Sequence, residues 1–303
     1  MNNTTPSACV PRYNGGLKWY KGNTHIHSTV SDGGWTFGRL ADAYGGVGYD
    51  FLFRTDHWIV SEAQREAPAS NGSLLWLDGV ELDGHDDVGG YYHVVCLGAF
   101  DGITREMGFP AALATAREQG GLMILAHPFW TGNSFEEATR WGFHGVELYN
   151  HVCQWLNGKG DARPYWHAML ADAPHTLGFA SDDAHTSASH PGWNGGWVMV
   201  EADARTPPAI LAGLRSGRFY SSTGPEFHTI VCDGDTVTAT TSPVQFARLV
   251  GPKSVGRRIG SFEGALIDHL AFEVPADWRY AYLEIEDNCG KRAWTNTLFI
   301  DAL

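Results

Sequence analysis

Short apolar runs alternate with amphipathic stretches of helical length over the first three quarters of the chain, up to about Thr223. The runs expected to be strands are residues 49–55, 74–82, 122–126, 145–149 and 176–180. Helices are expected to begin near Thr36, Phe109, Ser134 and Asp161, and a last one between Thr206 and Gly217. This alternation is typical of parallel strands joined by crossover helices. The sequence therefore predicts an α/β fold.

The pattern changes from Gly224 onward, where the helical period disappears. Residues 227–232 and 280–286 instead alternate apolar and polar side chains, and the turn formers Asp233-Gly234 and 288–290 follow them. Alternation bounded by such turns is typical of antiparallel strands. We therefore expect residues 1–223 to form the α/β domain and residues 224–303 to form a small, all-β, sandwich-like domain.

Charge and cysteine content narrow the classes of function. The chain carries 21 Lys and Arg against 34 Asp and Glu, a formal charge of -13, which predicts that polymeric nucleic acid is not a partner. Five cysteines without a C-x-x-C pair fit reduced thiols in a cytoplasm. No apolar run approaches the length of a membrane span, and residues 1–12 lack a basic segment followed by an apolar one. We expect a cytoplasmic protein with no membrane partner, and the oligomeric state is left open.

Metal-ligating residue types recur where the expected strands end. His25 and His27 stand two apart at the end of one strand, so both imidazoles point to the same side. The other candidates along the chain are Asp32, His57, Glu81, His93, His127, Asp183 and His185. In a barrel of parallel strands the carboxyl ends of the strands meet on one face. Nitrogen and carboxylate ligands without thiolate suit zinc, manganese or iron(II).

The charges of this ligand set favour a phosphate substrate. Three carboxylates facing three divalent ions leave a positive excess that can hold a hydroxide and a phosphate dianion. Glu81 could bridge two ions, and a water activated by the metal would be the nucleophile.

The order H-x-H, S-D-G, T-D-H, G-x-E, A-H-P and D-x-H between about Lys18 and Ser222 resembles the PHP superfamily, the polymerase and histidinol phosphatase phosphoesterases. The resemblance implies a distorted seven-stranded (β/α) barrel with two to three divalent ions (Mn, Zn or Fe). It also implies that the nine residues named above are ligands. By analogy, the first ion is held by His25, His27, Glu81 and Asp183, the second by Asp32, His57 and His185, and the third by Glu81, His93 and His127.

Residues 217–225 and 291–296 resemble the branch of this superfamily that joins the barrel to a small β domain and includes carbaryl-type carbamate hydrolases. The favoured function is a metal-dependent phosphoesterase acting on a small phosphate monoester or diester, such as a nucleotide or sugar phosphate. A metallohydrolase of an ester, amide or carbamate is the alternative. A non-catalytic binding protein with a vestigial metal site is the third possibility.

Several assignments compete with a neighbour or with a structural role. His85 competes with His93, and Asp182 competes with Asp183, which we prefer because the D-x-H spacing puts it on the same side as His185. Asp56 and His185 are candidates for proton transfer, and Asp56 could instead support a ligand.

Substrate contacts are less well defined than ligands. Asn150 and His151 follow a strand and could touch the substrate, although a helix-capping asparagine explains the first equally well. Cations that could hold a phosphate, with surface charge as the competing explanation, are Arg54, Arg140, Lys159 and Arg163. Tryptophans that could stack on a base or aryl group, with packing as the competing explanation, are Trp58, Trp130, Trp155 and Trp193.

Overall fold

A computed structural model describes residues 9–13, 15–60 and 74–301. The helices are α1 (Phe37–Gly46), α2 (Phe109–Glu118), α3 (Pro128–Thr131), α4 (Phe135–Arg140), α5 (His151–Asn157), α6 (Arg163–Asp172) and α7 (Pro207–Arg215), with a 3-10 turn at Arg105–Met107. The strands up to Thr223 are β1 (Cys9–Pro11), β2 (Lys18–Asn23), β3 (Phe51–Arg54), β4 (Leu75–His85), β5 (Tyr91–Leu97), β6 (Leu122–Leu125), β7 (Gly145–Asn150), β8 (Leu177–Ser181), β9 (Trp197–Ala202) and β10 (Phe219–Ser222). The later strands are β11 (Phe227–Asp233), β12 (Thr236–Val244), β13 (Phe246–Val250), β14 (Gly256–Ile259), β15 (Ile267–Glu273), β16 (Tyr282–Glu286), β17 (Arg292–Thr295) and β18 (Phe299–Asp301).

Seven consecutive strands, β2 to β8, curve into a distorted barrel. Their order in the sheet follows the sequence, and a parallel bridge between Ile26 and Ala184 brings together the segments that follow β2 and β8. β2, β3 and β4 are parallel neighbours, and so are β6, β7 and β8, whereas β5 is antiparallel to both β4 and β6. The predicted α/β class is confirmed, and the antiparallel β5 is the distortion.

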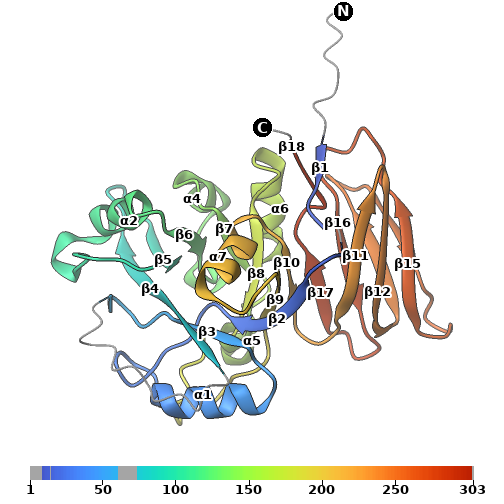
Figure 1. Cartoon of the computed structure of the whole chain (residues 1–303). Helices are drawn as coiled ribbons and strands as arrows, with labels where there is room; N and C mark the ends of the chain where they lie inside the picture. Colours follow the sequence, from blue (N-terminus) through green and yellow to red (C-terminus); the bar gives the residue numbers. More distant parts are fainter. Residues whose placement is uncertain (1–8, 14, 61–73, 302–303) are drawn as a thin grey trace, which may run out of the picture.

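The same sheet continues out of the barrel into the β-rich part. β9 and β10 add antiparallel strands beside β2, and β10 pairs with β17, which leads on to β16, β13 and β14. A separate sheet of β11, β12 and β15 faces these strands across a core that includes Phe227, Leu270 and Leu283. Figure 1 shows the barrel and this β-rich part side by side, and the sheet runs from one to the other through β9, β10 and β17. The boundary between residues 223 and 224 stays a prediction, because β10, before the boundary, pairs with β17, after it.

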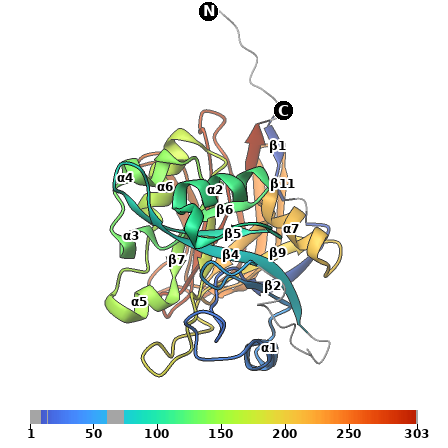
Figure 2. The same cartoon turned by 90° about the vertical axis from the view of Figure 1, so that its left-hand side faces the viewer.

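The β4–β5 hairpin differs most from the expectation. β4 runs beyond Glu81 to His85, so Glu81 lies inside the strand and not at its end, and β5 is an additional strand. The Asp86 carboxylate closes the turn by accepting hydrogen bonds from the backbone N–H groups of Val88 (3.1 Å) and Gly90 (2.8 Å). Figure 2 shows the long β4 with β5 beside it. Helix α5 and strand β9 are also additional to the expected elements.

The β-rich part packs on the barrel through aromatic side chains. Trp166 on α6 is fully buried, and its ring centroid lies 4.6 Å from that of Tyr282 on β16. Tyr13 is also fully buried and donates from its hydroxyl to the carbonyl of Phe219 (2.5 Å). Within the described residues no helix is long and apolar enough to cross a lipid bilayer.

Candidate metal centre

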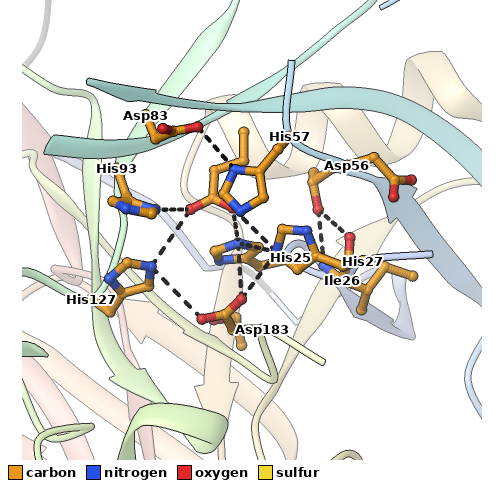
Figure 3. Close-up of polar contacts among 12 residues, drawn as sticks. His25, Ile26, His27, Asp56, His57, Asp83, His93, His127 and Asp183 are labelled. Carbon is orange, nitrogen blue, oxygen red and sulfur yellow. Dashed lines mark hydrogen bonds and ion pairs between the residues drawn. The ribbon is translucent and has the colours of Figure 1, made fainter. Parts of the chain in front are cut away.

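The nine residues predicted as ligands converge at one end of the barrel. His25 and His27 follow β2, His57 follows β3, and His127 follows β6. Asp183 and His185 follow β8, while Glu81 and His93 project from the β4–β5 hairpin. Figure 3 shows His25, His27, His57, His93, His127 and Asp183 turned toward one another. Residues up to 160 positions apart in the sequence, from His25 to His185, therefore share one site.

The deepest group contains two imidazoles and two carboxylates, all buried. Glu81 Oε2 lies 3.0 Å from His25 Nε2 and 3.1 Å from His27 Nε2. Asp183 Oδ1 lies 3.3 Å and 3.1 Å from the same two nitrogens. These are the four residues expected around the first ion, and their ligand atoms all lie within 4.8 Å of one another.

A second group lies nearer the surface around Asp32, whose side chain is half exposed. Its carboxylate is 3.4 Å from His27 Nδ1, 3.8 Å from His57 Nε2 and 3.2 Å from His185 Nε2. The three residues expected around a second ion, Asp32, His57 and His185, therefore lie close together. His27 also belongs to this group.

The remaining side of the cluster differs from the analogy. His93 Nδ1 lies 2.7 Å from Glu81 Oε1, and the ligand atoms of these two residues group with His57. His127 instead groups with His25 and Glu147. His127 Nε2 still faces the cluster, at 3.5 Å from Glu81 Oε1.

The donor set fits divalent cations. His25 Nε2 and His27 Nε2 lie 3.1 Å apart and both face Glu81 Oε2, which makes no hydrogen bond within the described part of the chain. Burying a charged oxygen without a partner is costly, and lone pairs that point at one another repel. A cation between these atoms removes both penalties. Nitrogen and oxygen donors of this kind suit zinc, manganese or iron(II).

The carboxylates also hold protons on the histidines when no cation is bound. Burial alone would lower the pKa of His27, but the adjacent carboxylates of Asp183 and Glu81 outweigh it and raise the pKa to about 10. Burial would raise the pKa of Glu81, but the neighbouring imidazoles hold it well below its ordinary value. Protons and metal ions therefore compete for the same nitrogens.

Two carboxylates that sequence reasoning did not select hold the imidazoles in place. Glu147 Oε1 lies 2.8 Å from His25 Nδ1, and Glu147 Oε2 accepts from the backbone N–H of His127 (2.9 Å). Asp83 Oδ1 lies 3.2 Å from His57 Nδ1. Each contact directs the other ring nitrogen, Nε2, to the cluster. Glu147 lies within the predicted strand 145–149, which was the available signal, whereas Asp83 carried none.

The structure sets Asp56 apart from the cluster. Its buried carboxylate accepts hydrogen bonds from the backbone N–H of Ser28 (2.8 Å) and the hydroxyl of Ser31 (2.7 Å). Figure 3 shows it to one side, turned away from the other labelled carboxylates and imidazoles. This geometry favours the supporting role over proton transfer, because Asp56 fixes the turn between His27 and Asp32.

The two expected substrate contacts behave differently. Asn150 caps α5 by accepting from Cys153 N–H (2.9 Å) and also donates to Asp183 Oδ2 (3.3 Å), so the capping explanation holds and the residue touches a candidate ligand. His151 lies against Gly195 and lines a different cavity, between α5 and the β-rich part, so its contact with a substrate stays a prediction.

The competing neighbours are separated by the fold. His85 is exposed at the end of β4, where its ring packs against Tyr91 (4.8 Å between ring centroids) and stays outside the cluster. The Asp182 carboxylate accepts from the backbone N–H groups of Asn194 (2.8 Å) and Gly195 (2.7 Å) and so holds a loop. Only His93 and Asp183 of these pairs enter the cluster.

Backbone strain is concentrated beside the cluster. His127 has φ 26° and Asp183 has φ 55°, both in the left-handed region that L-residues seldom occupy. Such conformations cost about 1–3 kcal/mol each and persist where surrounding contacts enforce them.

A cavity of ≈ 560 Å³ opens over the cluster. Apart from the candidate ligands it is lined by Trp130, Val152, Cys153, Leu156, Ser187, Ser189 and His190. Among the described residues that line it there is no lysine or arginine. The four cations considered as phosphate contacts are absent from this lining, and Arg140, for example, pairs with Asp86 (2.8 Å). Of the four tryptophans considered for stacking, Trp130 alone lines it.

Comparisons with known proteins show what this fold is similar to. No protein-family model matches the sequence, and no curated protein matches it. The chain is similar to a two-domain protein from Bacteroides vulgatus that contains a predicted PHP-like metal-dependent phosphoesterase, with a TM-score of 0.53 and 14% identity over 98% of this chain and 100% of that one. Two other matches are a candidate metal-dependent phosphoesterase from Bifidobacterium adolescentis (TM-score 0.43, 15% identity, 59% and 92% covered) and an amidohydrolase from Chromobacterium violaceum with bound sulfate (0.41, 14%, 65% and 96%). The first likeness supports the fold.

Proposed function

We propose that this protein is a metal-dependent phosphoesterase that hydrolyses a small phosphate monoester or diester, such as a nucleotide or sugar phosphate. One observation carries the proposal: His25, His27, Glu81 and Asp183 form a buried donor group, and further imidazoles surround it at the floor of an open cavity. Such a concentration of nitrogen and carboxylate donors in a cleft is expected of a hydrolytic metal site. The likeness in fold to a PHP-like protein agrees with it.

The proposed ligands are those of the sequence analysis. They would hold two or three divalent ions, of manganese, zinc or iron. When bound, such ions polarise phosphoryl oxygens and lower the pKa of water enough for it to attack at neutral pH.

The chain's own groups orient these ligands and shape the cavity. Glu147 and Asp83 fix the orientation of His25 and His57. His185 Nδ1 donates to the backbone carbonyl of Asp183 (2.9 Å), which leaves Nε2 facing Asp32 as an acceptor, so we favour a ligand role over proton transfer for His185.

The cavity wall supplies contacts for the substrate. Ser187, Ser189 and His190 offer donors on one side, and the rest of the wall is largely apolar. We therefore propose that the hydroxyl and imidazole groups bind the polar part of the substrate and that the apolar wall contacts the leaving group.

A hydrolase of a neutral ester, amide or carbamate is the second candidate. The absence of lysine and arginine from the described lining favours it, since a phosphate bound there would depend on the metal ions for positive charge. Trp130, Val152 and Leu156 would suit an aryl or alkyl substituent.

The direct test is release of p-nitrophenol from p-nitrophenyl phosphate by manganese-loaded protein, beside a chelator-treated sample. We expect release that the chelator abolishes, and we expect His57→Ala and His127→Ala each to lower it by about 100-fold or more. His85→Ala is the matched control, because His85 is exposed on the same hairpin as His93 and should leave activity unchanged.

The same assay separates the two candidates when p-nitrophenyl acetate and an aryl carbamate are added. Turnover of the neutral substrates without turnover of phosphate esters would contradict the phosphoesterase assignment. Metal binding without turnover on any of these substrates would count against both. We further propose a small-molecule substrate and a cytoplasmic location.

A further inference from the structure

A second large cavity, of ≈ 670 Å³, lies at the opposite end of the barrel. Leu122 and Leu177, the first residues of β6 and β8, line it. The candidate ligands His127 and Asp183 follow the other ends of these two strands. The strands therefore separate this cavity from the candidate metal centre.

The lining of this cavity is strongly basic. Three arginines and two histidines contribute to it, namely Arg12, Arg117, His144, His175 and Arg215. The described lining residues include no aspartate and no glutamate. In a chain with a formal charge of -13, a cavity with three arginines and no acid is not explained by the average composition.

Arg12 is the observation that points to a ligand. It is 5% exposed, and its Nη1 donates to the hydroxyl of Thr297 (3.0 Å). Its Nε is buried and finds no acceptor in the described part of the chain. The guanidinium lies against Gly217, where an added Cβ would come within 2.8 Å of its Cζ. Burying a guanidinium without a counter-ion is unfavourable, so an anion in the cavity would offset a cost that the fold otherwise bears.

The other two arginines stand at helix ends on the rim. Arg117, in the last turn of α2, donates to the carbonyls of Trp141 and Gly142, and Arg215, the last residue of α7, donates to Gly120 (2.6 Å). Neither pairs with a carboxylate in the described residues. A guanidinium has five N–H donors, so capping these carbonyls leaves donors free. Burial lowers the pKa of His144, and the positive charges of Arg117 and Arg215, which line the same cavity, lower it further.

We propose that this cavity binds a small phosphate-bearing molecule. Arg12, Arg117 and Arg215 all line the cavity and come from three separate segments of the chain. A phosphate presents oxygens in several directions and can accept from several guanidiniums, whereas a carboxylate presents two oxygens in one plane. The volume exceeds that of inorganic phosphate and lies in the range of small-molecule sites. This inference does not depend on the proposed function.

The test is calorimetric titration of the chelator-treated full chain with inorganic pyrophosphate at low salt. We expect saturable binding with a Kd below about 1 mM. The double variant R117Q/R215Q should weaken it by about tenfold or more, because hydrogen bonds to charged groups are lost. R257Q/R258Q removes two exposed arginines on β14 and is the matched charge control, expected to bind as the wild type does. Binding should also survive His57→Ala, which alters the candidate metal centre.

A measurement without variants gives an independent readout. Pyrophosphate should protect Arg117 and Arg215 from modification by phenylglyoxal, as detected by mass spectrometry, and should leave Arg257 and Arg258 reactive. If citrate binds with the same Kd as pyrophosphate, the assignment of the cavity to a phosphate group is overturned. Absence of saturable binding, absence of protection, or equal binding by R117Q/R215Q would overturn the site itself.

Discussion

Glu81 is the residue on which the candidate metal centre depends most. Its two oxygens together lie within 3.5 Å of nitrogens of five imidazoles. Oε2 faces His25, His27 and His57, and Oε1 faces His93 and His127. A single carboxylate cannot satisfy five imidazoles by hydrogen bonds alone, because it offers about four lone-pair sites. Cations shared among these groups would give every ring nitrogen and carboxylate oxygen a partner. The geometry therefore favours a metal site over a structural network of hydrogen bonds.

Glu147 should control metal affinity without being exposed to the cavity. Its two oxygens accept from His25 Nδ1, the Ser181 hydroxyl, the His127 N–H and the Asn150 amide. Glu147→Gln keeps the volume but puts an NH₂ group against these donors, so His25 loses its orientation. We expect manganese affinity to fall by about 10–100-fold in a titration of the purified variant.

The matched control for Glu147→Gln is Glu201→Gln, which alters another buried carboxylate, on β9 and outside the cluster. It should bind manganese as the wild type does. Equal affinity of the two variants would show that Glu147 does not position His25 for a metal.

The metal-free protein should lose stability as the pH rises. The pKa of His27 is raised from 6.5 to about 10 in the folded state. A raised folded-state pKa contributes stability that is fully present below about pH 6.5 and is lost as the pH passes through about 10. Urea unfolding of chelator-treated protein should therefore show a lower midpoint at about pH 9.5 than at about pH 6. His27→Gln should reduce this difference, whereas manganese should reverse it, because metal binding improves as imidazoles lose protons.

At the residue scale, the types and order of the ligands could be read from the sequence, because each stands beside a recognisable strand. The supporting residues could not be. Whether Glu147 or Asp83 orients an imidazole depends on which ring nitrogen faces it, and that is set by the three-dimensional arrangement of different strands. His151 shows that proximity to a strand end does not by itself place a side chain in the cavity over the cluster, because it lines a different cavity.

At the element scale, the turn between His27 and Asp32 fixes the outer group of ligands. Gly33 closes it by donating from its N–H to the carbonyl of Ser28 (2.8 Å), and a Cβ at Gly33 would lie 2.4 Å from the His27 carbonyl oxygen. Gly33→Ala must therefore shift the backbone that carries Asp32. We expect weaker manganese binding and lower stability, measured by titration and by urea unfolding.

Gly38→Ala is the control at this scale. Gly38 lies in α1, and an added Cβ there meets nothing within 4 Å. Alanine favours a helix over glycine by about 0.8–1.0 kcal/mol, so this variant should be as stable as the wild type or more so. Unchanged metal binding by Gly33→Ala would show that the turn does not position Asp32.

The parallel strands of the barrel were predictable because buried apolar runs and helical stretches alternate. The hairpin was not, because β4 continues through the polar residues Asp83 and His85, and β5 pairs antiparallel with it. Helix α5 has seven residues, of which only Val152 and Cys153 are buried. Two adjacent buried residues are too few to give a helical repeat of apolar positions in the sequence. Tertiary pairing decides such short segments.

At the scale of the whole molecule, the barrel and the β-rich part share one continuous sheet. Tyr220 and Ser221 on β10 pair on one side with Met199 and Val198 on β9 and on the other side with β17. A strand that is hydrogen-bonded on both sides cannot lose one neighbour without exposing its backbone groups. The two parts predicted from the sequence should therefore unfold together.

Asn296 tests this coupling. It is buried between the two parts: its side chain accepts from the N–H of Gly178 on β8 (2.9 Å) and donates to the carbonyl of Phe219 on β10 (3.0 Å). Asn296→Ala leaves the Gly178 N–H buried without its partner, and we expect a loss of about 1–3 kcal/mol in the free energy of unfolding. Urea unfolding followed by tryptophan fluorescence and by far-ultraviolet circular dichroism should give one coincident transition, displaced equally by both probes. Asn288→Ala, at an exposed turn of the β-rich part, should leave the midpoint unchanged. Two separated transitions in the Asn296 variant would mean that the β-rich part is stable by itself and that the shared sheet does not couple it to the barrel.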